Sequence, residues 1–328
     1  GSNGGLARYG LVVEPWLAFL RQRVDSYVFQ DRSVVEIVED VFADYAEAGA
    51  LAPAWRWELQ DRGVYPKRSL VTQYEESDFD FVQRLLAEEG IGYRFEHAGD
   101  ASGDTFGSHT LVLSDHNEAF ADAGRIRYHR ADATEADDSI QVWRGTRRAQ
   151  TARLSRASWD YRSLGLRPAS AEGDDVSGMG VEDDDTAGPY AWHDSADGER
   201  KVRQQLEALQ VRSHVFDGEG SWRALTPGAR FELTQHPDHT GEQAKFTCLQ
   251  VWHEARNNLG AEIFERSEAE LGPSLAPPLL AQALQGIGAP GVLALPAFGQ
   301  AQASAVARAN LDLGEGFYRN RFEAIPAA

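Results

Sequence analysis

The chain has 328 residues and a formal net charge of -19, with 51 acidic against 32 basic side chains. This length leaves room for two or three domains of roughly 100 to 200 residues, and a hydrophobic fraction of 42% indicates a globular chain. The negative charge argues against nucleic acid or an anionic membrane as a partner, and the chain has no apolar run of about 18 residues that would predict a membrane span.

The cysteine usage and the N-terminal sequence bear on redox chemistry and export. The single cysteine, Cys248, lies in an apolar run typical of a strand, which predicts a buried, unreactive thiol and excludes an intrachain disulfide. The N-terminus has no basic segment followed by an apolar core, so the sequence predicts no classical export signal and therefore synthesis in the cytoplasm.

The first elements are expected to be short. Apolar residues alternate over residues 9–13, which predicts a strand. Pro15 favours a short helix over residues 16–20, because its missing N–H costs nothing in a first turn. A loop that contains Phe29 is expected next.

A capping box then marks the first longer helix. Ser33 and Glu36 have the spacing at which each side chain caps the other residue's backbone N–H. We expect this helix to end at Gly49. Its apolar stripe contains Val34, Ile37, Val38, Val41, Phe42 and Tyr45.

A second helix is expected over residues 78–89. Ser77 can cap it, and Asp78 and Asp80 place negative charge at its positive end. Gly90 can end it in a left-handed conformation. The apolar side chains recur at helical spacing and are Phe79, Val82, Leu85 and Leu86.

Strands are expected on both sides of that helix. Trp55 and Trp57 alternate as in a strand, and residues 70–73 form the strand that leads to the helix. Residues 91–95 alternate after it, and we expect them to form a hairpin with residues 111–113.

The pattern turns to β structure after residue 120. Strands are expected over residues 126–129, 140–143 and 152–161. Residues 168–199 contain no lysine or arginine and many acids among glycine and serine, which predicts a mobile acidic loop. Residues 200–211 have helical apolar spacing.

The last third contains two strands and a proline-rich stretch. A turn at residues 226–228, with proline and glycine at its centre, precedes strands over 229–233 and 246–253. Residues 272–316 are rich in alanine, proline and glycine and predict a peripheral insertion, which proteases should cut early together with the acidic loop.

Two sets of side chains could suggest chemistry. His236 and His239 flank Pro237 and Asp238, with His253 as a distant third candidate for a metal site. Pro237 prevents the helical turn that would align the two histidines, so we interpret them as solvated loop residues.

The acidic pairs Glu75–Glu76 and Glu88–Glu89 could be glycosidase carboxylates. Neighbouring residues point in different directions in a helix or strand, so we interpret both pairs as solvated.

No other motif indicates catalysis. Ser77 lacks the glycine elbow of a hydrolase nucleophile. The glycine-rich pieces at 99–107 and 178–180 lack the strand, helix and lysine of a phosphate loop. The sequence therefore predicts no catalytic, cofactor-binding or metal-binding residue, and no cofactor.

One long stretch of the sequence is distinctive: residues 73–93, QYEESDFDFVQRLLAEEGIGY. Shorter distinctive stretches are EPW at 14–16, VFQ at 28–30, LVLSD at 111–115, LTPGARFEL at 225–233, VWH at 251–253 and YRNRFEAIP at 318–326. Together they resemble VgrG, the spike protein of type VI secretion, in the hub region that is similar to contractile-phage baseplate hubs.

The resemblance implies a fold class: α+β and β-rich, similar to a phage baseplate hub, with a tail-tube-type β-barrel and an α+β subdomain. It implies these divisions: 1–14, the end of an incomplete first barrel; 15–120, the α+β hub subdomain; 121–270, a second barrel-type region with the acidic loop 168–199; 271–316, the insertion; and 317–328, the closing strand of the hub. The chain is expected to be truncated at both ends relative to the family.

The resemblance also implies a function. We expect a non-enzymatic structural hub of the type VI secretion spike that assembles in full-length form as a trimer and helps deliver effectors into target cells. Expected partners are other copies of the chain, the hexameric tube protein, baseplate components and effector or adaptor proteins. Secretion would pass through the type VI apparatus without a signal peptide. The alternative is a carbohydrate- or peptidoglycan-active enzyme that uses paired carboxylates, suggested by the acids and the eight tryptophans.

Overall fold

The computed structural model describes residues 11–46, 52–99, 108–129, 137–256 and 317–327, together with the backbone at 2–3 and 6–7. The chain divides into two compact units, and the larger contains residues 15–253 and 319–328. The insertion predicted at 271–316 lies outside the described residues. Among the helices that are described, none has the length and apolar character needed to cross a membrane.

In the smaller unit, β1 (Ser2–Asn3) and β2 (Leu6–Ala7) form a short antiparallel pair. The strand expected over residues 9–13 is wrong at the positions that the structure describes. Leu11 and Val13 are in no strand and are 87% and 89% exposed. Alternating apolar residues form a strand only where a neighbouring strand accepts the backbone hydrogen bonds.

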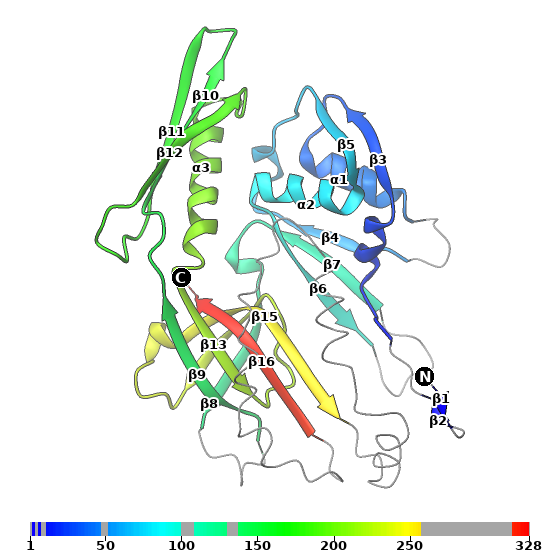
Figure 1. The fold of residues 1–328 in the computed structure, drawn as a ribbon, viewed down its shortest axis with the longest axis vertical. Coiled ribbons are helices and arrows are strands. Elements are labelled where there is room, and N and C mark those ends of the chain that lie inside the picture. The colour runs from blue at the N-terminus through cyan, green and yellow to red at the C-terminus, as the bar shows by residue number, and fades with distance from the viewer. Residues whose placement is uncertain are drawn as a thin grey trace. The chain divides into compact units, whose positions relative to one another are not determined.

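Residues 15–119 form an α+β module (Figure 1). Its helical elements are η1 (Trp16–Arg21), α1 (Val34–Ala43), η2 (Arg62–Val64), α2 (Asp78–Glu89) and η3 (Asn117–Ala119). Its strands are β3 (Val24–Phe29), β4 (Trp55–Glu58), β5 (Val71–Ser77), β6 (Gly92–Ala98) and β7 (Ser108–Ser114). β3 pairs with β5, and a second sheet has the order β4-β7-β6. Phe29 therefore ends a strand, where the sequence predicted a loop.

The capping box of α1 is confirmed. The Ser33 hydroxyl accepts the Glu36 N–H, and the Glu36 carboxylate accepts the Ser33 N–H at 2.8 Å. All six predicted stripe residues are buried. The helix ends at Ala43, earlier than predicted, with Asp44 as its C-cap, and Gly49 lies outside the described residues.

The predicted limits of α2 are also confirmed. Ser77 Oγ accepts the Asp80 N–H at 3.1 Å, and Gly90 ends the helix in the left-handed region with φ +69°. The four predicted apolar residues are buried, and so is Phe81, which stacks on Phe29 with ring centroids 5.6 Å apart. Because its sequence neighbours also pack inward, α2 has a wider buried face than the sequence predicted. The expected hairpin is present as well, since β6 pairs with β7 in antiparallel register.

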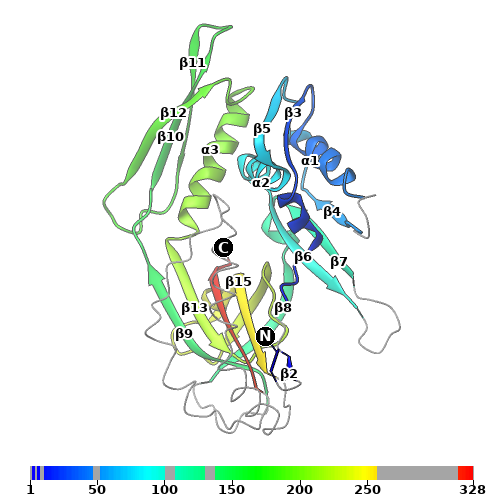
Figure 2. The same ribbon diagram turned by 45° about the vertical axis from the view of Figure 1, so that its right-hand side comes forward.

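A closed barrel with strand order β13-β16-β15-β14-β8-β9 follows the α+β module. Its strands are β8 (Ala121–Tyr128), β9 (Ser139–Arg147), β13 (His214–Gly220), β14 (Ala229–Thr234), β15 (Lys245–Arg256) and β16 (Phe317–Pro326), with the short helix η4 (Gly241–Ala244) before β15. β16 lies between β13 and β15 in this barrel (Figures 1 and 2). The core of this barrel contains Ile126, Ile140, Trp143, Phe216, Trp222, Leu225, Phe231, Leu233, Phe246, Cys248, Phe322 and Ala324.

A close approach between β13 and β9 leaves no room for a side chain at one glycine of the barrel. A Cβ at Gly220 would lie 2.2 Å from the backbone oxygen of Ser139. We therefore expect Gly220→Ala to lower the free energy of unfolding by about 1 to 3 kcal/mol, because the strands must separate to admit the methyl group. Urea denaturation followed by tryptophan fluorescence measures the change.

The matched control is Gly92→Ala in β6. The nearest atom to a Cβ there, outside the adjacent residues, would be the backbone oxygen of Ser114 at 4.0 Å, which is an ordinary van der Waals contact. Equal denaturation midpoints for the two variants would contradict the close approach at Gly220.

Between β9 and β13 the chain forms a three-stranded sheet and a long helix. These are β10 (Arg153–Asp160), β11 (Gly165–Glu172), β12 (Glu182–Pro189) and α3 (Ser195–Gln210). The sheet order is β11-β10-β12, and α3 packs on one face (Figure 2). The core between them contains Leu154, Ala169, Trp192, Val202 and Leu206.

The acidic loop predicted at 168–199 is wrong, because most of that stretch belongs to β11, β12 and the first turn of α3. Arginines of β10 form ion pairs with acids of this stretch. Arg156 pairs with Asp183 at 2.9 Å, and Arg153 lies 3.5 Å from Glu182. Ala169 of this stretch is buried in the core shared with α3, and Ala171 and Ala187 pack against that core. The helix predicted over 200–211 is confirmed, but it begins at Ser195 with Asp194 as its cap.

Candidate functional site

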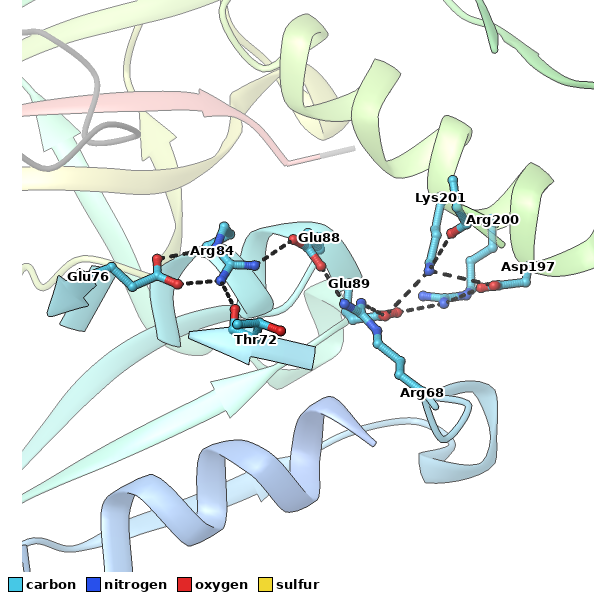
Figure 3. Close-up of polar contacts among 10 residues, drawn as sticks. Arg68, Thr72, Glu76, Arg84, Glu88, Glu89, Asp197, Arg200 and Lys201 are labelled. Carbon is cyan, nitrogen blue, oxygen red and sulfur yellow. Dashed lines mark hydrogen bonds and ion pairs between the residues drawn. The ribbon is translucent and has the colours of Figure 1, made fainter. Parts of the chain in front are cut away.

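The last residue of α2 is a buried carboxylate surrounded by cations. Glu89 is 1% exposed and accepts hydrogen bonds from Arg68 and Arg200, the latter at 2.7 Å. Lys201 Nζ lies 3.6 Å from its other oxygen. Arg68 precedes β5, whereas Arg200 and Lys201 belong to α3 (Figure 3). We call this cluster, together with Asp197 and Glu88, the α2–α3 junction.

The charges of the α2–α3 junction are matched. Asp197 lies 2.8 Å from Arg200 and 3.6 Å from Lys201, and Glu88 pairs with Arg68. Three cations thus face three carboxylates, which offsets the cost of removing them from water. Burial alone would lower the pKa of Arg68, but its hydrogen bonds to Glu88 and Glu89 raise that pKa above its ordinary value.

Gly90 ends α2 beside α3. A Cβ at Gly90 would lie 2.6 Å from the side-chain amide carbon of Gln204, on the same helix as Arg200. The left-handed conformation that ends α2 favours glycine, and a larger residue would also displace the Gln204 side chain. The junction connects elements more than 100 residues apart in sequence.

A second buried carboxylate lies at the other end of α2. Asp78 is fully buried and accepts from Arg23 at 2.6 Å, from the Tyr45 hydroxyl at 2.7 Å and from Gln73 at 2.8 Å. Burial first, and then the hydrogen bond to Asp78, raises the pKa of Tyr45. Both ends of α2 are therefore held by ionic contacts to residues outside the helix.

His236 and His239, the two candidate metal ligands nearest each other in sequence, lie at one end of the barrel. The rings of His236 and His239 are 4.7 Å apart, and His239 packs against Phe216 and Phe246 at 5.2 and 5.4 Å. They line a hollow with His214. Both lie in the loop after β14, as predicted, but they are only partly exposed to solvent because they pack against aromatic rings. Within the part of the chain that the structure describes, no three His, Cys, Asp or Glu residues are placed to hold a metal ion, and His253 is exposed on β15.

The barrel should be less stable in mild acid because of His214. Burial first, and then the positive charges of Arg147 and His239, lower the pKa of His214. The folded state thus binds fewer protons than the unfolded state. The contribution of His214 to the free energy of unfolding is therefore complete above the ordinary histidine pKa of about 6.5, and it is lost as pH falls below that value. We expect His214→Gln to reduce the difference in unfolding free energy between about pH 7.5 and 5.5. An unchanged pH dependence would contradict this role.

A family model described as phage tail baseplate hub (GPD) matches residues 1–259. The chain belongs to the phage tail baseplate hub family. Two curated relatives from Pseudomonas aeruginosa strain PAO1 are type VI secretion system spike proteins. VgrG4b is 32% identical over 240 residues, which is 71% of this chain and 28% of that relative. VgrG1b is 29% identical over 243 residues, which is 72% of this chain and 30% of that relative. This hub-family chain therefore spans less than a third of the length of these relatives.

A solved structure has the same fold. The E. coli c3393 protein, described as a component of the type VI secretion system with structural similarity to the T4 bacteriophage tail proteins gp27 and gp5, matches with a TM-score of 0.52. The match covers 95% of this chain and 53% of that one at 15% identity, so it concerns the fold alone. The α+β, β-rich baseplate-hub fold that the sequence predicted is confirmed.

In this hub-family chain three of the four paired acids are engaged in ion pairs. Glu88 and Glu89 belong to the α2–α3 junction and pair with Arg68, and Glu76 pairs with Arg84. The interpretation of Glu89 as solvated is wrong, because α3 covers it. Glu75 is exposed with φ +49°, on the strand that leads to α2. None of the four acids lines the hollow at the barrel end or the hollow beside β3.

The other candidate residues have structural roles in the hub. The Ser77 hydroxyl caps α2 and donates to Asp80 at 2.7 Å. Cys248 is buried in the barrel core, as predicted, and burial raises its thiol pKa to about 12. Gly178 and Gly180 lie in the turn between β11 and β12. That the chain has no catalytic, cofactor or metal residue remains a prediction.

Sequence reasoning missed the residues that hold α2 in place. Asp78 was interpreted only as a helix-end charge, and Arg200 only as the start of a helix. Their partners lie 55 and 111 residues away in sequence, so no local pattern indicates the contacts. The arrangement at both ends of α2 can fix the position of elements, but it leaves no carboxylate oxygen of Glu89 free for chemistry.

Proposed function

We propose that this chain is a structural hub of a type VI secretion spike. The observation that carries the proposal is a closed six-stranded barrel in a chain of the baseplate hub family, with spike proteins among its relatives. Closure leaves no free strand edge around the barrel, which suits a part that must stack without uncontrolled pairing. The ion pairs of the α2–α3 junction support a structural role, because they hold α2 and α3 together.

We infer a domain organisation for this hub. Residues 15–120 would be the α+β subdomain, and the barrel would be built from 121–270 and the closing strand in 317–328. The barrel strands within 121–147, 214–256 and 317–326 support that division. The sheet and helix between β9 and β13 would then be an insertion into the barrel domain. Residues 1–14 remain assigned to a first barrel only by the family resemblance.

We also infer how the hub assembles. In its full-length form it would be a trimer that docks on the hexameric tube, contacts baseplate components and helps deliver effectors or adaptor-bound cargo through the type VI apparatus. At a net charge of -19, copies of the present chain repel one another most at low ionic strength, where screening is weakest. The chain alone should therefore form a weak oligomer that dissociates further as salt is removed.

Light scattering across protein and salt concentration, together with co-purification of the tube protein, tests the proposal. We expect the full-length form to co-purify with the tube protein, and this binding to be lost in a folded Gly220→Ala variant whose barrel is deformed. Circular dichroism confirms that the variant is folded. Turnover of peptidoglycan or polysaccharide that one carboxylate substitution abolishes would overturn the structural role, as would the absence of tube binding at every concentration tested.

A further inference from the structure

One strand of the α+β module has an open, apolar edge. β3 pairs with β5 on one side, and no other described strand pairs with it. Val24, Tyr27 and Val28 are 64%, 56% and 46% exposed. Proteins usually protect such an edge with lysine, proline or a covering segment, but residues 24–29 contain neither lysine nor proline. The edge therefore has the properties of a site for strand addition.

A hollow lies between this strand and α1. Tyr27 and Phe29 of β3 and Val41 of α1 give it apolar walls. The rings of Tyr27 and Phe29 are 4.9 Å apart, and Phe29 stacks on Phe81 of α2. Because Phe81 is fully buried, its stacking holds the Phe29 side of the hollow against the core.

The charged residues that line the hollow leave an acidic excess. They are three aspartates and two arginines, namely Asp25, Asp40, Asp44, Arg23 and Arg32. Arg23 is engaged by Asp78 and by Asp44 at 2.8 Å, and Arg32 lies 3.7 Å from Asp40. Asp25 accepts only the N–H of its neighbour Ser26, at 2.7 Å, and forms no ion pair with the described residues. A partner with a cation would complete this site.

We propose that β3 and the hollow beside it bind an extended, basic and apolar polypeptide segment. The segment adds a strand to the free edge of β3, places a lysine or arginine beside Asp25 and packs an apolar side chain against Tyr27 and Phe29. A second copy of this chain fits less well, because each copy has a net charge of -19 and the same uncompensated aspartate. The site is separate from the barrel and goes beyond the proposed hub role.

The probe is a fluorescently labelled seven-residue peptide that alternates threonine and valine and has one central lysine. We expect it to bind the full 328-residue chain and to slow amide hydrogen exchange in β3. Asp25→Asn should weaken binding about two- to fivefold, the effect of losing one partly exposed ion pair. Asp184→Asn, an exposed acid of β12, changes the net charge equally and should leave the affinity unchanged.

Two further peptides separate the parts of the proposal. A peptide with glutamate in place of the lysine should bind more weakly than the lysine peptide, and methylation of alternate backbone nitrogens should abolish binding because it removes the ladder donors. Equal binding of the methylated peptide would overturn strand addition, and equal affinity of Asp25→Asn would overturn the cation site. A dimer that the peptide dissociates would make a second copy the occupant and overturn the assignment to a basic segment.

Discussion

Replacing Glu89 with glutamine is expected to lower the free energy of unfolding by about 3 kcal/mol. The substitution keeps the volume of the side chain but removes its charge, so Arg68, Arg200 and Lys201 lose the anion on which they converge. Breaking a buried ion pair by removing one partner leaves the other charges poorly compensated. Urea denaturation at neutral pH measures the loss.

Glu88→Gln is the matched control for this prediction. Glu88 precedes Glu89 on the same helix and also pairs with Arg68, but its side chain is 39% exposed. Water compensates the loss of an exposed pair, so the effect should stay within about 1 kcal/mol. A double-mutant cycle with Arg200→Gln should show a coupling of about 0.5 to 3 kcal/mol to Glu89. Equal effects of the two glutamate substitutions would show that the burial of Glu89 contributes nothing.

The limits of α2 could be predicted from the sequence because every signal that fixes them is local. Ser77 caps a backbone N–H three residues away, and Gly90 occupies the left-handed position directly after the helix. The apolar residues that lie between Ser77 and Gly90 also recur at short, helical spacing. The capping box of α1 was predicted for the same reason, whereas the end of α1 was not, because its last turn stops at Asp44 without glycine.

The α2–α3 junction could not be predicted, because its chemistry depends on tertiary contact. Glu88 and Glu89 look alike in sequence, yet only Glu89 faces α3, whose arginine is 111 residues away. The prediction of a mobile loop over residues 168–199 was wrong for a related reason. Its acids satisfy a rule for disorder, but strand β10, which lies before it in the chain, supplies the arginines that pair with them. Charge composition alone does not show where the compensating charges lie.

The second large effect is expected at Leu85. This side chain is fully buried on α2, which packs against η1, α1 and β5. Leu85→Ala should lower the free energy of unfolding by about 2 to 5 kcal/mol, because it removes buried apolar atoms and leaves a cavity that the surrounding elements fill only in part. Alanine favours the helix at least as well as leucine does, so any loss reports packing and not helix propensity.

Gln83→Ala, on the exposed side of the same helix, is the matched control that separates loss of core packing from other effects of an alanine substitution in α2. It removes only the hydrogen bond to the Tyr93 hydroxyl, which is 3.1 Å long and exposed, so its cost should be within about 1 kcal/mol. Thermal and urea unfolding of both variants against the native chain give the comparison. If Leu85→Ala melts with the native chain, α2 does not pack into the core, and the positions of Glu89 and of the α2–α3 junction would have to be reconsidered as well.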